Sequence, residues 1–230
     1  MASSRLSVAA KWAADGLLAL DFHAHGLPND KPKEFYADLY RGELKDYFWQ
    51  GRDSREATFF HALYLRLQRA LDVAAAQPEW NGRQLLVSGR SQGGGQAIVA
   101  GGLDPRVTFI AAEIPAFCDH TGIVADRLNG WPRLIPNETE QPEAKAVNAV
   151  RYYDTVNFAA RSKAQAFLTV GFIDMVCPPT GVYAAYNQFP GQKRIWNHRD
   201  TGPISRAEYD AGVRDAVLAY LTAARPQPPK

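Results

Sequence analysis

The sequence predicts an α/β fold in which helices cover both faces of a mostly parallel sheet. Three observations lead to this class. Short apolar runs of strand length alternate along the chain with stretches of helical periodicity. Strands that alternate with helices in this way favour a parallel sheet covered on both faces. The chain has 230 residues, of which 46% are hydrophobic, so we expect one domain over residues 1–225 and a disordered tail at 226–230.

The N-terminal third contains fewer regular elements than the rest. A helix is expected from the sixth residue onward, capped by Ser3 or Ser4. Residues 17–22 are apolar except for Asp21 and predict a short, buried strand. Residues 23–56 are interrupted by prolines and glycines, which favours a long irregular excursion with one helical turn. Residues 57–76 carry apolar side chains at three- and four-residue steps and predict a helix.

The remaining two thirds alternate more regularly. Strands are expected at residues 84–88, 106–114, 164–171 and 193–196. Helices are expected at residues 97–101, 178–186 and 205–224, the last opened by a capping box of Ser205 and Glu208. Residues 117–150 are rich in proline and polar side chains, and we expect a cap-like insertion there. Functional groups in parallel sheets gather beyond the carboxyl ends of the strands.

Charge and cysteine content restrict the classes of partner. The 26 basic and 24 acidic side chains leave a formal charge of +2, and no basic run predicts a nucleic-acid partner. No apolar stretch approaches the roughly 18 residues of a membrane helix, so no membrane association is expected. Cys118 and Cys177 lack a metal-ligand pattern and favour a reduced chain in the cytoplasm. Each is expected to be a buried thiol.

One motif carries nucleophilic chemistry. Residues 89–93, Gly-Arg-Ser-Gln-Gly, match the pattern G-x-S-x-G and lie between a predicted strand and a predicted helix. In that setting a sharp turn lifts the hydroxyl of Ser91 off the sheet, and a Cβ on either flanking glycine is expected to clash. The backbone N–H of Gln92 would point at a developing oxyanion. The alternative interpretation is a glycine-rich turn without catalytic chemistry.

A serine nucleophile needs a base and a group that orients the base. In folds of this kind the chain order is serine, acid, histidine. His198 follows the last predicted strand, and Asp174 follows the strand at 164–171. We therefore expect Ser91, Asp174 and His198 to form a catalytic triad. His120, in the irregular segment, is the other downstream histidine, and Asp200 is a rival acid that would reverse the usual order.

Three segments resemble the acetyl xylan esterase and cephalosporin-C deacetylase family of α/β-hydrolases. They are Gly89-Arg-Ser-Gln-Gly-Gly-Gly95 with Leu103-Asp-Pro-Arg-Val107, Tyr153-Asp-Thr-Val-Asn-Phe-Ala159, and Val170-Gly-Phe-Ile-Asp-Met-Val-Cys-Pro-Pro-Thr180 with Ala184-Ala-Tyr-Asn187. The resemblance covers roughly residues 8–198. It implies an α/β-hydrolase fold and the same triad. It also implies hydrolysis of short acyl esters, chiefly acetyl, on sugars such as xylan fragments, without a metal or cofactor.

The chain departs from the family pattern in three places. His23-Ala24-His25-Gly26 stands where the family has R-G-Q-G, and His198 precedes Arg199 where the family has a glutamate. The family also carries an H-G-Y loop, which donates a second N–H to the oxyanion, ahead of the segment resembling residues 11–16. Only ten residues precede that segment here.

These departures predict a hydrolase shortened on its N-terminal side. Loss of one oxyanion donor costs roughly two to three powers of ten in rate. We expect a weaker esterase or a substitute donor from His23, His25 or a neighbouring subunit. An exposed sheet edge would favour a homo-oligomer, a dimer or larger. The alternative is that His25-Gly26 is itself the missing loop.

Further residues are candidates for binding a small acylated substrate. His23 and His25 follow a predicted strand, and Tyr47 and Trp49 belong to an aromatic cluster that would line a pocket or pack in the core. Two other functions stay open. One is an acyltransferase or peptidase that uses the same triad; the other is a catalytically weak homologue that acts as a binding protein.

Overall fold

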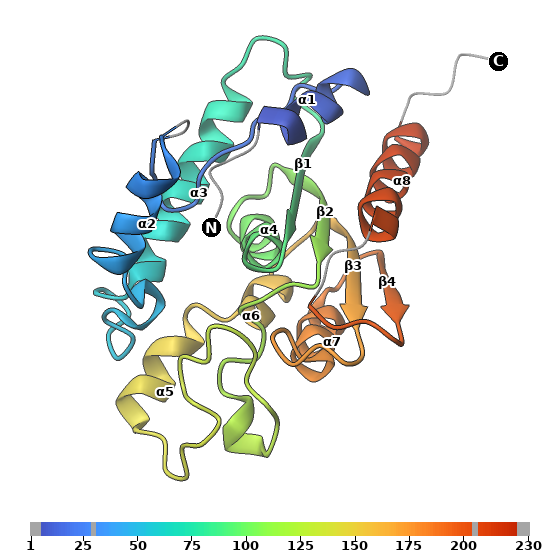
Figure 1. The fold of residues 1–230 in the computed structure, drawn as a ribbon. Helices are drawn as coiled ribbons and strands as arrows, with labels where there is room; N and C mark the ends of the chain where they lie inside the picture. Colours follow the sequence, from blue (N-terminus) through green and yellow to red (C-terminus); the bar gives the residue numbers. More distant parts are fainter. Residues whose placement is uncertain (1–5, 29–30, 204–206, 225–230) are drawn as a thin grey trace, which may run out of the picture.

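The computed structural model describes residues 6–28, 31–203 and 207–224 (Figure 1). Its sheet contains four parallel strands in the order β1-β2-β3-β4. The strands are β1 (Leu85–Arg90), β2 (Val107–Glu113), β3 (Gln165–Gly171) and β4 (Lys193–His198). All four lie where the sequence predicts strands, so the predicted parallel sheet is confirmed for this part of the chain.

Helices occupy about half of the remaining described residues. The α-helices are α1 (Leu6–Ala14), α2 (Lys33–Arg41), α3 (Phe59–Ala75), α4 (Gln92–Leu103), α5 (Ala144–Arg151), α6 (Thr155–Ala159), α7 (Pro179–Gln188) and α8 (Ala207–Ala223). Two short 3-10 helices are η1 (Tyr47–Trp49) and η2 (Gly122–Ala125). The predicted caps of the first helix at Ser3 or Ser4, the capping box of the last helix and the tail at 226–230 lie outside the described residues or side chains. Among the described helices, none has the length and apolar character needed to span a bilayer.

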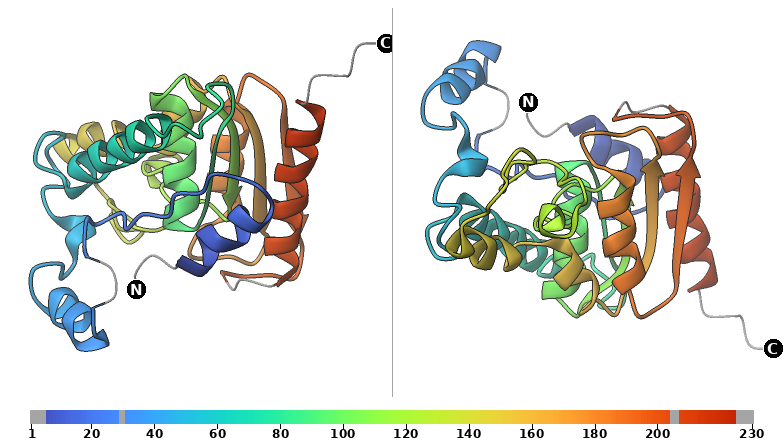
Figure 2. Two further views of the ribbon diagram at one scale, coloured as in Figure 1. Left: turned by 90° about the horizontal axis from the view of Figure 1, so that it is seen from above. Right: turned by 90° about the horizontal axis from the view of Figure 1, so that it is seen from below.

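The helices form a layer on each side of the sheet (Figure 2). Helix α8 covers one face, where Val213 and Val217 pack against Phe109, Ala111 and Phe167. Helices α3, α4, α6 and α7 lie on the opposite side in both views. The alternation of side chains along β2 explains this arrangement, because successive residues of a strand point to opposite faces.

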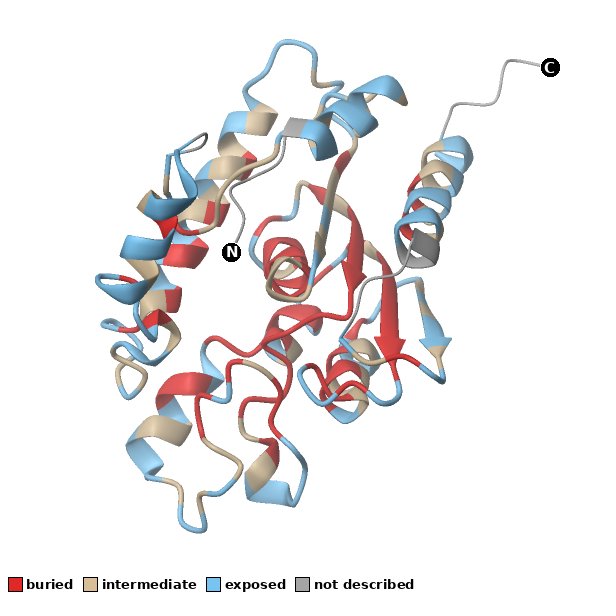
Figure 3. Ribbon diagram, viewed as in Figure 1, coloured by how far each residue is buried: buried red, intermediate tan, exposed pale blue. Residues whose placement is uncertain are grey.

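The central strands form the buried part of the sheet. Strands β2 and β3 are almost entirely buried, whereas β4 is half exposed (Figure 3). The larger core cluster lies on the α4 side and contains the fully buried rings of Phe60 and Phe117. A continuous apolar strand sequence fits a position between two helical layers.

The predicted strand at residues 17–22 is wrong, because the structure has irregular backbone there. A parallel strand requires a hydrogen-bonded neighbour, and β1 pairs only with β2 in the described sheet. The segment instead passes from one face to the other: Leu17 joins the α8-side cluster, and Phe22 packs against the larger core. Leu18 and Leu20, at 52% and 49% exposure, stay at the surface.

The excursion at 23–56 contains more helix than predicted. Helix α2 begins after Pro32 and buries Tyr36, whose hydroxyl donates to the carbonyl of Pro28 at 2.7 Å. The 3-10 helix η1 then places the aromatic side chains of residues 47–49 beside α3. Pro32 and Gly42 flank α2, and Asp46 and Gln50 flank η1, whereas the prediction allowed only one helical turn in this region.

Register brings the carboxyl ends of the strands to one edge of the sheet. Arg90 pairs with Glu113, and Gly171 pairs with His198. The loops that leave this edge therefore start close together. They contain Ser91, residues 114–121, Asp174 and the segment after His198, which places the sequence-predicted site residues on adjacent loops.

Candidate active site

Ser91 occupies a strained turn between β1 and α4. Its φ of 53° and ψ of −114° lie in a region that side-chain-bearing residues rarely adopt. Three backbone hydrogen bonds hold the turn. The N–H of Ser91 donates to the carbonyl of Glu113 at 2.9 Å, and its carbonyl accepts from the N–H groups of Gly95 at 3.0 Å and Ala116 at 2.9 Å. This is the geometry expected for an exposed serine on a strand-to-helix turn.

The glycines of the turn have different roles. A Cβ on Gly89 would lie 2.3 Å from the carbonyl oxygen of Gly93, and a Cβ on Gly95 would lie 2.4 Å from the carbonyl oxygen of Ala116. A Cβ on Gly93 would meet nothing within 4 Å. The expectation that both glycines flanking the motif prevent a clash is confirmed for Gly89 and wrong for Gly93. The close approach of Gly95 to the loop after β2 is an additional constraint.

Asp174 is completely buried in the loop after β3, at 0% exposure. Its Oδ1 accepts from the backbone N–H groups of Val176 at 2.7 Å and Cys177 at 2.8 Å. Its Oδ2 is buried, and no group in the described parts of the chain donates to it. One oxygen is therefore committed to shaping the loop, while the other remains an available acceptor.

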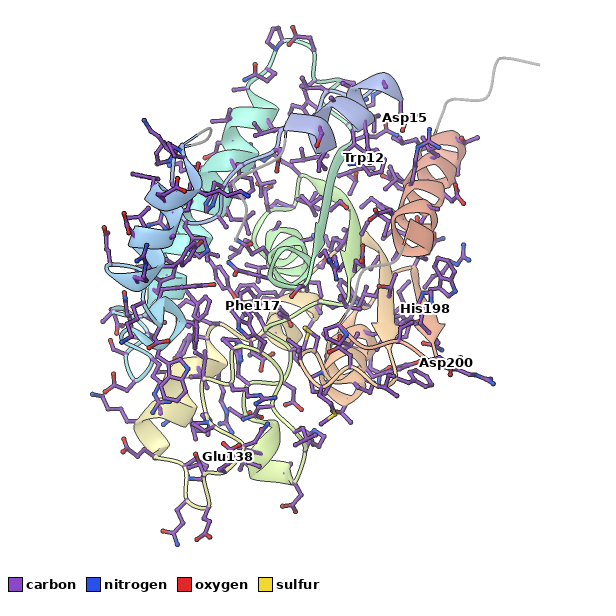
Figure 4. The ribbon with its side chains drawn as sticks, in the orientation of Figure 1. Trp12, Asp15, Phe117, Glu138, His198 and Asp200 are labelled. Carbon is purple, nitrogen blue, oxygen red and sulfur yellow. The ribbon has the colours of Figure 1, made fainter. Side chains whose placement is uncertain are left out.

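His198 is the last residue of β4 and lies beside the start of the Asp174 loop. Its carbonyl accepts from the N–H of Phe172 at 2.9 Å. Its ring contacts Trp196 with a centroid separation of 4.4 Å, and it does not donate to Oδ2 of Asp174 in this conformation. Figure 4 shows His198 at the carboxyl end of β4 and Asp200 in the segment that follows. The structure thus brings the backbones of Asp174 and His198 together but does not form their side-chain hydrogen bond.

Cys177 lies between the acid and the serine. Its N–H contacts Asp174, as described above, and its thiol interacts with the side chain of Ser91. Burial, reinforced by the nearby Asp174 carboxylate, raises the pKa of the Cys177 thiol to about 12. The thiol is therefore neutral near pH 7. Sequence reasoning treated Cys177 only as a buried thiol, although its position three residues after Asp174 was an available signal.

A ladder of backbone contacts joins the segment after β2 to the Asp174 loop. The N–H of Phe117 donates to the carbonyl of Trp131 at 3.1 Å, and the N–H of Trp131 donates to the carbonyl of Val176 at 2.6 Å. Val176 in turn donates to Asp174 Oδ1. The central position of Phe117, below α4, is visible in Figure 4. Part of the segment expected to form an insertion is therefore built into the wall of the site.

His120 has a structural setting. The backbone N–H groups of Asp119 and His120 donate to the carboxylate of Asp154 at 3.0 and 2.6 Å, and that of Val156 donates to it at 3.0 Å. Burial raises the pKa of Asp154 to about 6 and lowers that of His120 to about 4. The motif around Tyr153 thus anchors the loop after β2. His120 lies within this anchor rather than on the last strand's exit.

The four predicted substrate-binding residues have different surroundings. His25 is buried against Tyr47, with their ring centroids 4.5 Å apart, and burial lowers its pKa to about 4, with His23 and Arg66 adding to the effect. Tyr47 is 2% exposed, and its hydroxyl donates to Oε1 of Gln92 at 2.7 Å. His23 is half-buried, and burial lowers its pKa as well. Trp49 is 40% exposed, and the guanidinium of Arg52 lies 4.2 Å from the centre of its ring.

The fold and the strained serine turn define the class of α/β-hydrolases. Within that class, the family model described as acetyl xylan esterase (AXE1) matches residues 2–220. The chain therefore belongs to the acetyl xylan esterase family, which confirms the resemblance inferred from its motifs.

Individual relatives agree with this assignment. The chain is 34% identical over 184 residues to the acetyl esterase Axe7A of Xylanibacter ruminicola, a match that includes 79% of this chain and 42% of that protein. The chain thus spans less than half of that relative.

Two solved structures have the same fold. An acetyl xylan esterase from Paenibacillus sp. R4 has a TM-score of 0.72 at 23% identity, with 94% of this chain and 69% of that chain covered. Acetyl xylan esterase 1 from a Thermoanaerobacterium species has a TM-score of 0.67 at 22% identity, with 95% and 71% covered.

Proposed function

We propose that this protein is a serine carboxylesterase that hydrolyses short acyl esters, chiefly acetyl esters of sugars such as xylan fragments. The observation that carries the proposal is the strained backbone of Ser91 at the start of α4. Such strain is costly and is typical of residues whose side chains must be presented for chemistry. Membership of the acetyl xylan esterase family supports the choice of acetyl esters.

The proposed reaction has two stages. The hydroxyl oxygen of Ser91 attacks the ester carbonyl carbon, its proton passes to His198, and the carbonyl π electrons move to the oxygen. The tetrahedral intermediate collapses as the C–O bond to the alcohol breaks and His198 returns the proton to that alcohol. Water, deprotonated by His198, then attacks the acyl carbon of the acetyl-enzyme. The bond from that carbon to Ser91 Oγ breaks, His198 returns the proton to Oγ, and acetate leaves. The N–H of Gln92 stabilises the oxyanion in both stages.

Asp174 is proposed to orient the base. Its Oδ2 is buried, and no described group donates to it, so it can accept a hydrogen bond from the ring N–H of the imidazole. This requires the His198 ring to leave its contact with Trp196 and turn toward the neighbouring strand's loop. A fixed carboxylate then holds the imidazole in the tautomer that can accept the serine proton.

The residues proposed for substrate binding divide into two groups. Trp49 and His23 retain accessible surface and are proposed to contact the sugar or acyl group. His25 and Tyr47 are buried and are proposed to support the wall behind it. An aromatic side chain at a sugar-ester site offers an apolar surface with a polar rim.

Self-association is proposed as well. The outer edge of β1 carries no hydrogen-bonded strand within the described sheet, and Leu18 and Leu20 lie exposed in the adjacent segment. Unprotected strand edges promote pairing between chains. Light scattering after size-exclusion chromatography is expected to give a mass of at least twice 25.4 kDa.

The test of the catalytic proposal compares the protein with its Ser91→Ala variant. The parent is expected to hydrolyse p-nitrophenyl acetate and release acetate from acetylated xylo-oligosaccharides, and the variant is expected to lose both activities. A fluorophosphonate should label the parent at Ser91 alone. Equal turnover by parent and variant would refute the proposed mechanism.

A further inference from the structure

The segment that follows β4 runs across the carboxyl edge of the sheet to the end of β1. In the described sheet, β4 and β1 are the two outermost strands. Near β4, the carbonyl of His198 accepts from the N–H of Phe172 at 2.9 Å. Near β1, Nη2 of Arg90 donates to the carbonyl of Pro203 at 2.8 Å. We call residues 198–203 the crossing segment, because its two ends are bonded to opposite sides of the sheet.

The middle of the crossing segment lies against the end of β3. The carbonyl of Thr201 accepts from the N–H of Ile173 at 3.3 Å, in the loop that leads to Asp174. A Cβ on Gly171, the last residue of β3, would lie only 2.4 Å from the same carbonyl oxygen. Thr201 is itself buried. The crossing segment therefore connects the base, the aspartate loop and the residue that precedes Ser91.

Arg90 is fixed for this contact by a buried carboxylate. Glu113 is the last residue of β2, and only 6% of its side chain is exposed. Its Oε1 lies 3.0 Å from Nε of Arg90. A buried carboxylate is costly without a cation beside it, so Glu113 favours the observed position of the guanidinium. The planar group then has a second donor, Nη2, available for Pro203.

His198 needs such support because it ends an edge strand. In the described sheet, β4 pairs with β3 alone, and it is the most exposed of the four strands. The ends of weakly packed elements open more readily than the core of a fold. The proposed mechanism requires the imidazole to reach both Ser91 and Asp174, and a misplacement of about 1 Å can reduce a rate about 100-fold. An anchor beyond His198 would limit this loss of precision.

We propose that Arg90 is a positioning residue for the base. By holding Pro203 against the ends of β1 and β2, it keeps the crossing segment, and with it His198, in a constant place relative to Ser91. The inference rests on the proposed esterase function. Arg90 acts through His198 and not on the substrate. Its removal should therefore slow proton transfer in both stages of the reaction and leave substrate binding unchanged.

The experiment measures p-nitrophenyl acetate hydrolysis by variants of the anchor. In Arg90→Met, which keeps an apolar stem, kcat is expected to fall about 10- to 100-fold with KM within about twofold of the parent. Arg90→Lys keeps the charge beside Glu113 but lacks the planar fork, so its kcat should be intermediate. The double variant Arg90→Met/Glu113→Gln removes the carboxylate that would be left without its cation. It should recover thermal stability, yet its kcat should stay low because Pro203 still lacks a donor.

Arg106 provides a matched control at the other end of β2. Its guanidinium lies 2.6 Å from the carboxylate of Asp104, whose side chain is 2% exposed. The two arginine side chains are exposed to a similar extent, 35% for Arg106 and 40% for Arg90. Arg106 precedes the first residue of β2, at the edge of the sheet opposite Ser91. Arg106→Met should lose thermal stability as Arg90→Met does but keep the parental kcat.

Proton magnetic resonance gives an independent readout of the base. In a trifluoromethyl ketone adduct of the parent, the hydrogen shared by His198 and Asp174 is expected to give a resonance at unusually low field. This resonance should broaden or disappear in Arg90→Met and in the double variant, and it should persist in Arg106→Met. Circular dichroism and thermal melting verify the folding of each variant, and the double variant retains the test if Arg90→Met does not fold.

The outcomes separate the inference from the proposed function. Parental kcat or an unchanged resonance in Arg90→Met would overturn the inference and leave the esterase proposal standing. Recovery of kcat in the double variant would assign the loss to the unpaired carboxylate and would overturn it as well. Absence of turnover and of fluorophosphonate labelling in the parent would overturn both.

Discussion

A Cβ on Gly89 would lie 2.3 Å from the carbonyl oxygen of Gly93, so the end of β1 and the first turn of α4 are too close for any side chain at residue 89. Residue 93 itself faces open space. The two glycines therefore form a matched pair for mutation. Gly89→Ala is expected to destabilise the protein by about 3 kcal/mol because backbone must move. Gly93→Ala should be neutral or stabilising by up to about 1 kcal/mol, since alanine is the better helix former. Urea unfolding measures both, and similar losses in the two variants would contradict the geometry.

Asp174→Asn tests the orienting carboxylate. The amide oxygen can still accept from the N–H groups of Val176 and Cys177, so the loop should keep its shape. The replacement of Oδ2 by a donor disfavours the required imidazole tautomer, and kcat is expected to fall by about 10⁴. Asp200→Asn, in the neighbouring loop, is the control and should retain the parental kcat (Figure 4). Steady-state kinetics decide, and a loss in Asp200→Asn that equals the loss in Asp174→Asn would point to the rival acid.

The two cysteines are expected to be chemically inert in the folded protein. Burial raises the pKa of Cys177 to about 12 and that of Cys118 well above its usual range, so neither is a thiolate at pH 8. Iodoacetamide followed by mass spectrometry should detect almost no alkylation of the native chain and complete alkylation in urea. Rapid modification of Cys177 without denaturant would show that the space beside Ser91 is more open than the structure indicates.

Stability is expected to fall in mild acid because of His25. Its pKa is lowered from 6.5 to about 4, mainly by burial, so the unfolded chain binds a proton between these values and the folded chain does not. The stabilisation from neutral His25 is present above pH 6.5 and is lost as the pH falls toward 4, by about 3 kcal/mol. His120, whose pKa is likewise lowered to about 4 by burial, acts in the same sense as His25. Asp154, whose pKa is raised to about 6, acts in the opposite sense, because its protonation stabilises the fold as the pH falls. His25→Phe keeps the aromatic contact with Tyr47 and removes the titration. Urea unfolding at pH 7 and 4.5 should show a smaller loss in this variant than in the parent. An equal loss would exclude His25 as the cause.

Pairing between strands explains which parts of the fold could be predicted from sequence. Each of the four strands that entered the sheet had a neighbour, and apolar runs located three of them, whereas β4 is largely polar. The run at 17–22 had the same composition but no hydrogen-bonded partner in the described chain. Composition reports what a segment can bury, whereas a strand also requires another segment to receive its backbone hydrogen bonds.

The site shows a similar division. Strand order and the carboxyl-edge rule located Ser91, Asp174 and His198 at the same edge of the sheet, but their catalytic roles stay predictions. The contact between Tyr47 and Gln92 joins residues 45 positions apart and has no periodic signal. The thiol of Cys177 beside Ser91 is likewise a product of tertiary packing. The open space at Gly93 depends on the path of α4 and could not be derived from the motif.

The backbone ladder from Phe117 through Trp131 to Val176 has a consequence for motion. One bond joins Phe117 to Trp131, and the next joins Trp131 to Val176 in the loop after β3. Because Trp131 takes part in both bonds, we expect them to break together. The amide protons of these residues should exchange with solvent at one common opening free energy, as a single cooperative unit. Fluctuations that admit or release a ligand would then move the loop after β2, which contacts Ser91, and the loop that contains Asp174 together.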